Sequence, residues 1–299
     1  APEDRVVIRS WSEMRGPGLR GAWCPDGLPA GSPEAGGEAL ARALLDLEPS
    51  ACLRRLPGRE TFLVDLGGAV PRPLEVEGDA LGLELEALQG AGRVVVVKRY
   101  RSPERREALR ELVAGLAPRS PGRREAENLA GLREAGMPVP RPLLWVRRGS
   151  TSLVALEYHA HARTLRGALE AGEPCALELA ELAHLTAALH AAGWYHRDLY
   201  LEHLLLTDAG LLLIDAGRAR QDPLPRLRWL AKDLAALSSS APDALGFGRL
   251  RFLVRWRRAM ARAGRPIDVR ALTADIARRE ERMRAHTPRH KHRPLDPAA

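Results

Sequence analysis

The chain has 299 residues, of which 45% are hydrophobic, and this is enough to bury a sizeable core in one two-lobed domain or two small ones. A formal net charge of +8 favours a polyanionic partner such as a nucleotide, an anionic lipid or a nucleic acid, without choosing among them. Three widely spaced cysteines, no Cys-x-x-Cys pair and no signal-like or membrane-spanning apolar run argue against a disulfide framework, a zinc site and a transmembrane protein.

The first half of the chain predicts mainly β-structure. Residues 16–37 are crowded with Gly and Pro, which predicts a loop or mobile arm ahead of a short helix near 38–47. Strands are expected at 61–66 and at the β-branched run 94–97, which ends in Lys98. This pattern is typical of an antiparallel sheet.

Helical spacing of leucines predicts two helices between residues 103 and 135, with a break at Pro118 and Pro121. Two more strands are expected at 143–146 and 152–156, after the helix-ending segment Gly-Met-Pro-Val-Pro. The sheet therefore continues beyond the helices.

The second half turns helical from Thr164 onward. A leucine stripe predicts the longest helix over 176–192. Two short strands follow at 204–206 and 211–214, separated by the hairpin turn signal Thr-Asp-Ala-Gly, and helices continue to about residue 285. A sheet-rich first half and a helix-rich second half predict an α+β chain in two lobes.

The strongest functional signal lies between the long predicted helix and the hairpin. His-Arg-Asp occupies positions 196–198, and the second hairpin strand leads into Asp-Ala-Gly at 215–217. This order is the layout of a kinase catalytic loop followed by its metal-binding loop. Alternatively, His-Arg-Asp could occur by chance and Asp215 could simply begin a turn, but the surrounding helix, loop and hairpin disfavour this.

Phosphoryl transfer needs an oriented acceptor hydroxyl, clamped nucleotide phosphates and neutralised charge. We expect Asp198 to act as the catalytic base, with His196 and Arg197 beside it in the catalytic loop. Asp215, a hard oxygen ligand, is expected to hold Mg²⁺ against the β- and γ-phosphates of ATP.

Lys98 stands where a kinase places the lysine that contacts the α- and β-phosphates and pairs with a helix glutamate. A solvated strand-end lysine is the alternative. The rarity of lysine favours the functional interpretation, because the chain uses Arg almost everywhere and Lys only at 98, 232 and 291. Glu125 and Glu127 point about 200° apart on the next helix, so only one of them can face Lys98.

The stretches rich in glycine ahead of Lys98 are Gly67-Gly68 and residues 78–92, and neither contains Gly-x-Gly-x-x-Gly. A glycine loop that covers the nucleotide phosphates is therefore not established by the sequence.

Three motifs resemble the lipopolysaccharide kinase family, which includes the kinases of core heptose and Kdo and belongs to the protein-kinase-like superfamily. They are Gly-Trp-Tyr-His-Arg-Asp-Leu-Tyr-Leu-Glu-His-Leu-Leu-Leu from residue 193, Leu-Ile-Asp-Ala-Gly-Arg-Ala-Arg from 213 and Arg-Trp-Leu-Ala-Lys-Asp-Leu-Ala-Ala-Leu from 228. The resemblance covers about residues 58–260, and the stretch 70–92 looks like an insertion in it.

The resemblance has implications for single residues. The register of Arg-Glu-Ala-Glu-Asn favours Glu125 as the partner of Lys98. His203 stands where protein kinases place asparagine, and imidazole is a poor magnesium ligand. We expect one protein-held metal, or a water-bridged second one, with His203 bonded to phosphate or to Asp198. Asp233 is expected to accept backbone hydrogen bonds from the catalytic loop.

The resemblance also implies a protein-kinase-like bilobal fold, with a β-sheet-rich N-lobe and a helical C-lobe. The expected parts are a partly flexible N-terminal extension at 1–57, an N-lobe at 58–157, a C-lobe at 158–285 and a basic tail at 286–299.

The expected function is ATP-dependent transfer of the γ-phosphoryl group to a sugar hydroxyl of the lipopolysaccharide core or a related glycolipid. A kinase of proteins or small molecules, and an inactive pseudokinase or binding module, remain as alternatives.

We expect a cytoplasmic protein, associated with the inner face of the cytoplasmic membrane. Arginines at 251, 255, 257, 258 and 262 could contact an anionic membrane surface, although a solvated helix is an equal alternative. No nucleic-acid recognition motif is present.

Overall fold

The computed structural model describes residues 11–24, 36–49, 51–68, 70–74, 93–101, 105–113, 115, 117–222, 224, 226–242 and 248–285. Predictions that fall on 25–35, 78–92 and the tail 286–299 lie outside this described part.

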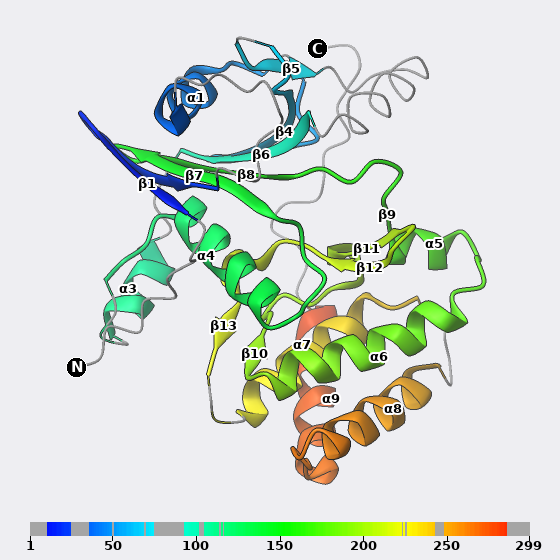
Figure 1. Ribbon diagram of the computed structural model, residues 1–299. Helices are drawn as coiled ribbons and strands as arrows, with labels where there is room; N and C mark the ends of the chain where they lie inside the picture. Colours follow the sequence, from blue (N-terminus) through cyan, green and yellow to red (C-terminus); the bar gives the residue numbers. More distant parts are fainter. Residues whose placement is uncertain are drawn as a thin grey trace. The chain divides into compact units, whose positions relative to one another are not determined.

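Two compact units divide the chain. The first contains residues 1–163 and 205–219, and the second contains 164–204 and 220–299. An antiparallel sheet dominates the first unit and helices dominate the second (Figure 1), which confirms the α+β class. The domain boundaries predicted from the sequence stay predictions.

The large sheet of the first unit has eight strands in the described part of the chain, and every pairing is antiparallel. Their order across the sheet is β1 (Ser12–Gly16), β2 (Leu19–Trp23), β7 (Pro142–Arg148), β8 (Thr151–Glu157), β6 (Val94–Tyr100), β4 (Arg59–Asp65) and β3 (Arg54–Leu56), and β5 (Arg72–Leu74) also pairs with β4. The Lys98 strand, β6, therefore lies between β8 and β4.

The loop predicted for 16–37 is wrong for residues 19–23, which form β2. Pro17 and Gly18 make the two-residue turn of the β1–β2 hairpin, and Gly18 has φ +70°. A Cβ on Gly21 would approach the backbone oxygen of Trp145 to 2.5 Å, so this glycine allows β2 to pair closely with β7. The glycines that predicted a loop instead serve a turn and a close strand contact.

Two helices of the first unit lie on opposite faces of the sheet in Figure 1: α1 (Gly36–Asp46) and α4 (Pro121–Glu134). Leucines of α1 share a buried cluster with Phe62, Val64 and Val97 of the sheet. Ser120 caps α4 and Pro121 occupies its first turn, so the proline break predicted between this helix and α3 (Arg105–Val113) is confirmed.

The β-hairpin predicted after the catalytic loop is present as β11 (Leu204–Thr207) and β12 (Gly210–Leu213). It belongs to a three-stranded sheet in the order β12, β11, β9 (Arg163–Thr164). The backbone N–H of Leu213 donates to the carbonyl of Pro138 at 2.8 Å, and the 3₁₀ turn η3 (Ala216–Arg218) follows.

The second unit contains the helices α5 (Leu165–Glu170), α6 (Ala176–Ala191), α7 (Leu227–Ser240), α8 (Gly248–Arg262) and α9 (Val269–Ala285), with the 3₁₀ turn η2 (Leu201–His203). The strands β10 (Trp194–Tyr195) and β13 (Arg220–Gln221) pair antiparallel. Helix α6 packs on α8, and α7 packs on α9.

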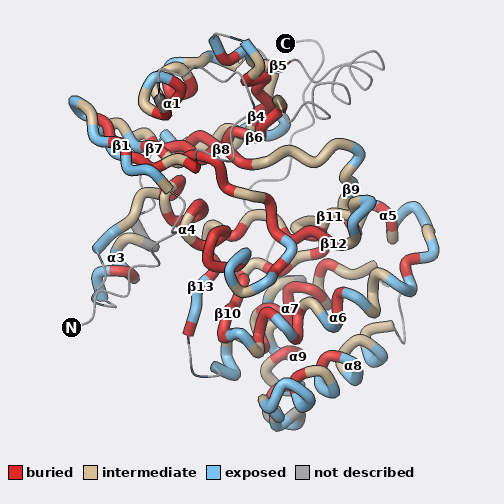
Figure 2. The backbone as a smooth tube through the Cα atoms, in the orientation of Figure 1, coloured by how far each residue is buried: buried red, intermediate tan, exposed pale blue. Residues whose placement is uncertain are grey.

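Alanines of α6 and large side chains of α8 share one buried cluster, so small residues on one helix leave room for Trp256 and Met260 on the other. In Figure 2, α8 is mostly exposed or intermediate along its length, so only a few of its residues, Trp256 and Met260 among them, are buried. No helix in the described ranges is both long and apolar enough to span a bilayer.

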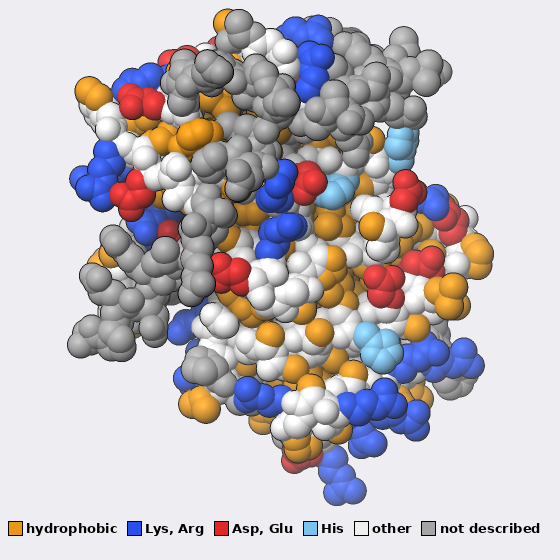
Figure 3. Space-filling view, in the orientation of Figure 1, with side chains coloured by type: hydrophobic (Ala, Val, Ile, Leu, Met, Phe, Trp, Pro, Cys, Tyr) orange, Lys and Arg blue, Asp and Glu red, His pale blue; other side chains and the backbone are white. Residues whose placement is uncertain are grey.

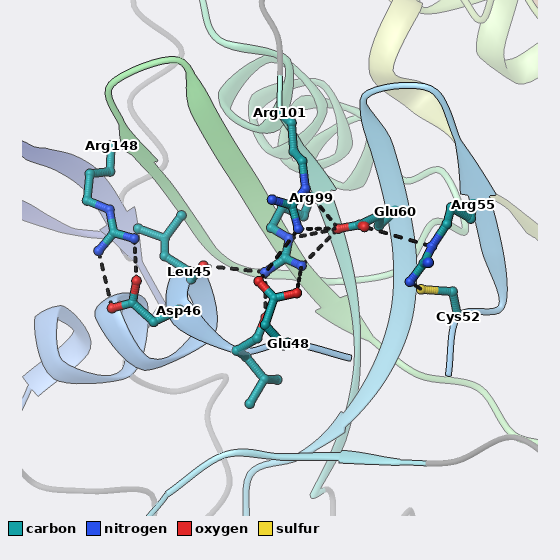
Figure 4. A network of polar contacts seen from close by, with 10 residues as sticks. Leu45, Asp46, Glu48, Cys52, Arg55, Glu60, Arg99, Arg101 and Arg148 are labelled. Atoms are coloured by element: carbon teal, nitrogen blue, oxygen red, sulfur yellow. Dashed lines mark hydrogen bonds and ion pairs between the residues drawn. The ribbon is translucent and has the colours of Figure 1, made fainter. Parts of the chain in front are cut away.

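A buried arginine connects β6 to the segment after α1 (Figure 4). The Arg99 side chain is 2% exposed, and it donates to Oε2 of Glu60 at 2.8 and 3.0 Å and to the carbonyl of Leu47 at 2.5 Å. Its guanidinium also lies 5.3 Å from the ring centre of Phe62. Lys98 and Arg99 are adjacent on a strand, so they face opposite sides of the sheet.

We predict that Glu60→Gln lowers the free energy of unfolding by about 3 kcal/mol at neutral pH, because it leaves the buried Arg99 charge with only the distant and exposed Glu48 as an anionic partner. Burial raises the pKa of Glu60, and Arg99 and Arg101 outweigh burial, so that its pKa lies below 4.5. This contribution is therefore present above the ordinary pKa and is lost as the pH falls through the folded pKa.

Urea unfolding followed by circular dichroism measures the difference, which should shrink as the pH falls below 4.5. Glu13→Gln is the control, because its pair with Arg15 is exposed and should contribute at most about 0.5 kcal/mol. A Glu60 variant as stable as wild type, or a difference that does not change with pH, would contradict the prediction.

Candidate active site

Lys98 and Glu125 form a buried ion pair in the first unit. Lys98 stands on β6 between Thr61 of β4 and Val154 of β8 in the register. Its Nζ lies 2.5 Å from Oε1 of Glu125 on α4, and the two side chains are 9% and 0% exposed. Glu127 instead pairs with arginines. Of the two candidate glutamates, the structure pairs Lys98 with Glu125.

Tyr100 holds the second oxygen of Glu125. It follows Lys98 by two residues on β6, so both side chains lie on one face of the sheet. The Tyr100 hydroxyl donates to Oε2 of Glu125 at 2.5 Å. Burial and the neighbouring Glu125 charge raise the pKa of Tyr100 well above 10, so the phenol remains a neutral donor. Each oxygen of Glu125 therefore has a partner.

Asp215 follows β12 and lies beside two cations. Its Oδ1 is 3.5 Å from Nζ of Lys98 and 3.0 Å from Nη2 of Arg59. The Asp215 backbone is left-handed, with φ 62° and ψ 48°, a conformation that Asp tolerates better than most residues. Asn128 on α4 donates to two carbonyls of the following turn at 2.8 and 2.9 Å. The helix that carries Glu125 therefore also fixes the backbone beside Asp215.

The predicted catalytic loop of the second unit is organised by Asp233 on α7. This carboxylate is fully buried and accepts the backbone N–H of His196 at 2.9 Å and of Arg197 at 2.6 Å. The backbone role predicted for Asp233 is confirmed. Nδ1 of His190 accepts from Trp256, so its Nε2 carries the proton and faces Asp233 at 3.3 Å.

Asp198 lies next to a lysine. Nζ of Lys232 is 3.3 Å from Oδ1 of Asp198, and it also donates to the carbonyl of Arg197. Nδ1 of His203 lies 2.7 Å from the backbone carbonyl of Asp198. Because a carbonyl only accepts, this nitrogen must carry the proton. His203 therefore contacts the Asp198 backbone, and Lys232 contacts the Asp198 carboxylate.

His196 and Arg197 are buried rather than open to solvent. The His196 side chain is 0% exposed, and its ring centre lies 6.0 Å from that of His203. Arg197 has φ 69°, and its guanidinium lies 4.9 Å from the ring centre of Trp229. These contacts are typical of residues that shape a loop, and the catalytic assignment of both stays a prediction.

The predicted site residues fall into two groups, each within one unit. Lys98, Glu125 and Asp215 lie together in the first unit, and His196, Arg197, Asp198 and His203 lie together in the second.

Five residues in these groups did not receive these roles from the sequence: Arg59, Tyr100, Asn128, His190 and Lys232. Three had a usable signal. Tyr100 shares a strand face with Lys98, and Asn128 lies one helical turn after Glu125. Lys232 is one of only two lysines in the described part of the chain. Arg59 and His190 carry no local signal, because only tertiary contacts place them here.

Comparisons with known proteins agree with the sequence motifs. The model of the lipopolysaccharide kinase (Kdo/WaaP) family matches residues 85–252. The lipopolysaccharide core heptose(I) kinase WaaP of Pseudomonas aeruginosa is 31% identical over 253 residues, which is 76% of this chain and 91% of that protein. The solved structure of WaaP in complex with acyl carrier protein aligns with a TM-score of 0.50 and 26% identity, over 81% of this chain and 91% of that one.

We predict that Asp233→Asn lowers the free energy of unfolding by about 2–3 kcal/mol, because an amide cannot accept both loop N–H groups as a carboxylate does. Phosphoryl-transfer activity should fall with it. Thermal and urea unfolding measure the first effect. Asp208→Asn, in the exposed turn between β11 and β12, is the matched control. Wild-type stability and activity in the Asp233 variant would show that the loop does not depend on this carboxylate.

Proposed function

Because the chain belongs to the lipopolysaccharide kinase (Kdo/WaaP) family and is therefore a phosphotransferase that uses ATP, we propose that it phosphorylates a sugar hydroxyl of the lipopolysaccharide core or a related glycolipid. We further propose that the reaction takes place at the cytoplasmic face of the inner membrane. The observation that carries the proposal is the buried Lys98–Glu125 pair with Asp215 3.5 Å from Lys98. A heptose is the first acceptor to test, because the relative is a core heptose kinase.

Lys98 and Asp215 suit the two charged parts of the nucleotide. Lys98, held by Glu125, would bind phosphate oxygens of ATP. Proteins usually bind Mg²⁺ through one or two carboxylates together with substrate phosphates, and the Asp215 carboxylate fits that need. The described residues contain no group of three or more His, Cys, Asp or Glu side chains that could hold a metal by themselves. When bound, ATP supplies the phosphoryl group and Mg²⁺ neutralises charge on the phosphates.

Asp198 would accept the proton that the acceptor hydroxyl loses as its oxygen bonds to phosphorus. Lys232, 3.3 Å from the Asp198 carboxylate and bonded to the Arg197 carbonyl, would hold this carboxylate against the backbone of the loop. His203, bonded to the Asp198 carbonyl, and the buried pair His196 and Arg197 would hold the loop in place. Asp198 is then the base, and Lys232, His203, His196 and Arg197 are positioning residues.

We predict that MgATP stabilises the wild-type chain by about 2.7 kcal/mol at one hundred times its dissociation constant, and that Asp215→Asn loses most of this stabilisation. Asn keeps the size of the side chain and tolerates the left-handed backbone, so the substitution mainly removes charge. Melting temperatures with and without MgATP measure the effect. Asp208→Asn serves again as the control, because its carboxylate lies in an exposed turn.

Transfer of labelled phosphate from ATP to isolated glycolipid, protein and metabolite fractions then identifies the acceptor class. Labelled glycolipid supports the proposal, and label confined to protein or metabolites favours the other kinase classes. A wild-type chain that MgATP does not stabilise would favour a binding module.

The exposed face of α8 suits an anionic lipid surface. This helix has no acidic residue, and arginines 251, 255, 257, 258 and 262 are all exposed. The structure describes no ion pair for these five. Leu250 and Val254, 59% and 36% exposed, lie between the arginines on the helix surface. In Figure 3 basic side chains gather over α8. An apolar strip flanked by arginines is typical of helices that lie on membranes, so we propose that α8 contacts the bilayer that carries the acceptor.

We predict that the chain sediments with vesicles that contain phosphatidylglycerol and not with neutral phosphatidylcholine vesicles, because each arginine near an anionic surface contributes about 1 kcal/mol. The triple change of Arg255, Arg258 and Arg262 to Gln should weaken binding at least tenfold, and salt should do the same. A matched variant replaces the exposed Arg20, Arg54 and Arg147 with Gln, so both variants lose three charges. Equal binding of the two variants would exclude α8 as the contact.

A further inference from the structure

Arg59 begins β4 and lies beside the Lys98–Glu125 pair. It pairs with Tyr100 in the register of β4 and β6, which places it on the same face of the sheet as Lys98. Nη2 of Arg59 is 3.0 Å from Oδ1 of Asp215, closer than Nζ of Lys98 at 3.5 Å. Its guanidinium also lies 5.4 Å from the ring centre of Tyr100. The group therefore contains a second cation as well placed as the lysine.

The Arg59 guanidinium is charged and not fully bonded. A guanidinium stays protonated in proteins, so this side chain carries a full positive charge. Its side chain is 23% exposed, and its Nε is buried with no acceptor among the described residues. Buried donors usually have an acceptor, so this nitrogen indicates a place for an oxygen-bearing ligand.

The glycine turns in the described part of the first unit offer little to a phosphate. The turn between β3 and β4 is Pro57-Gly58, and Pro57 has no N–H. The N–H of Gly67 already donates to Asp65 at 2.8 Å. A loop that cradles phosphates needs several backbone N–H groups that point at the ligand. Among the described residues, side chains rather than backbone N–H groups therefore offer the positive charge that phosphates need.

We infer that Arg59 is a nucleotide-phosphate-binding residue, which bonds to phosphate oxygens alongside Lys98. A guanidinium matches phosphate geometry with two parallel hydrogen bonds, as an ammonium does not. A metal ion on Oδ1 of Asp215 would repel a guanidinium at the same oxygen, and a phosphate offers that guanidinium a new acceptor. The inference rests on the proposed kinase function, since it assigns Arg59 to the phosphates of that nucleotide.

A competing role for Arg59 has the opposite consequence. If Arg59 only occupies Asp215 and hinders metal binding there, its removal should tighten the binding of MgATP. If Arg59 binds phosphate, its removal should weaken that binding. The sign of the change therefore decides between the two roles.

Isothermal titration calorimetry of MgATP, MgADP and adenosine on the full chain tests the inference. Arg59→Met keeps an unbranched side chain over Tyr100 and removes the charge. The dissociation constant of MgATP should rise about 10- to 100-fold, as expected for losing hydrogen bonds from a charged group, and that of adenosine should stay unchanged. Arg59→Lys retains the charge and should lose less, which a purely structural role would not produce.

Arg54→Met is the matched control, because Arg54 is exposed on the neighbouring strand β3. Circular dichroism checks that each variant folds, and Arg59→Lys carries the test if Arg59→Met does not. Wild-type affinity in the folded Arg59 variants overturns the inference, and so does tighter binding, which would instead support the hindering role. If the wild-type chain does not bind MgATP, the proposed kinase function is itself contradicted.

Discussion

The buried ion pair between Lys98 and Glu125 is the constraint on which the first unit depends. Burying two charges is costly unless they lie close together and their remaining hydrogen-bonding groups also have partners. Here the Tyr100 hydroxyl donates to the second oxygen of Glu125. The pair can form only if α4 lies close to the sheet. A Cβ on Gly122 would approach the Leu153 backbone to 2.5 Å, so the glycine at the start of α4 permits that approach. Asn128, one turn after Glu125, then holds the backbone after Asp215.

The second unit uses a buried carboxylate in a different way. Asp233 has no lysine or arginine partner among the described contacts and instead accepts two backbone N–H groups and faces His190. Such bonds fix the path of the main chain, so Arg197 can keep a positive φ that would otherwise be unfavourable. The loop leaves the Asp198 carboxylate beside Lys232. Both described lysines of this arginine-rich chain therefore stand next to an aspartate of the proposed site.

Local patterns predicted much of this arrangement, and long-range packing produced the rest. The proline break before α4, the hairpin after the catalytic loop and the backbone role of Asp233 follow from turn chemistry and motif register, and all three are present. Strand β2 could not be predicted, because its glycines serve a turn and a close approach to β7 that only the pairing reveals. Arg59 was missed for a similar reason. An arginine at the start of a strand is ordinary until cross-strand register places it by Asp215.

The strand order shows that the residues matched by the family model do not include all the strands that complete the sheet. The family match begins at residue 85, after β1 to β5, yet β2 pairs with β7 and β4 pairs with β6. A fragment cut to that match would leave β6 and β7 with unpaired N–H and C=O groups along both edges of a three-stranded ribbon. One edge would be the valine run of β6, and exposed apolar edges are templates for strand addition between molecules. Strands outside the family match therefore cover the edges of the Lys98 strand and its neighbours, which disfavours self-association.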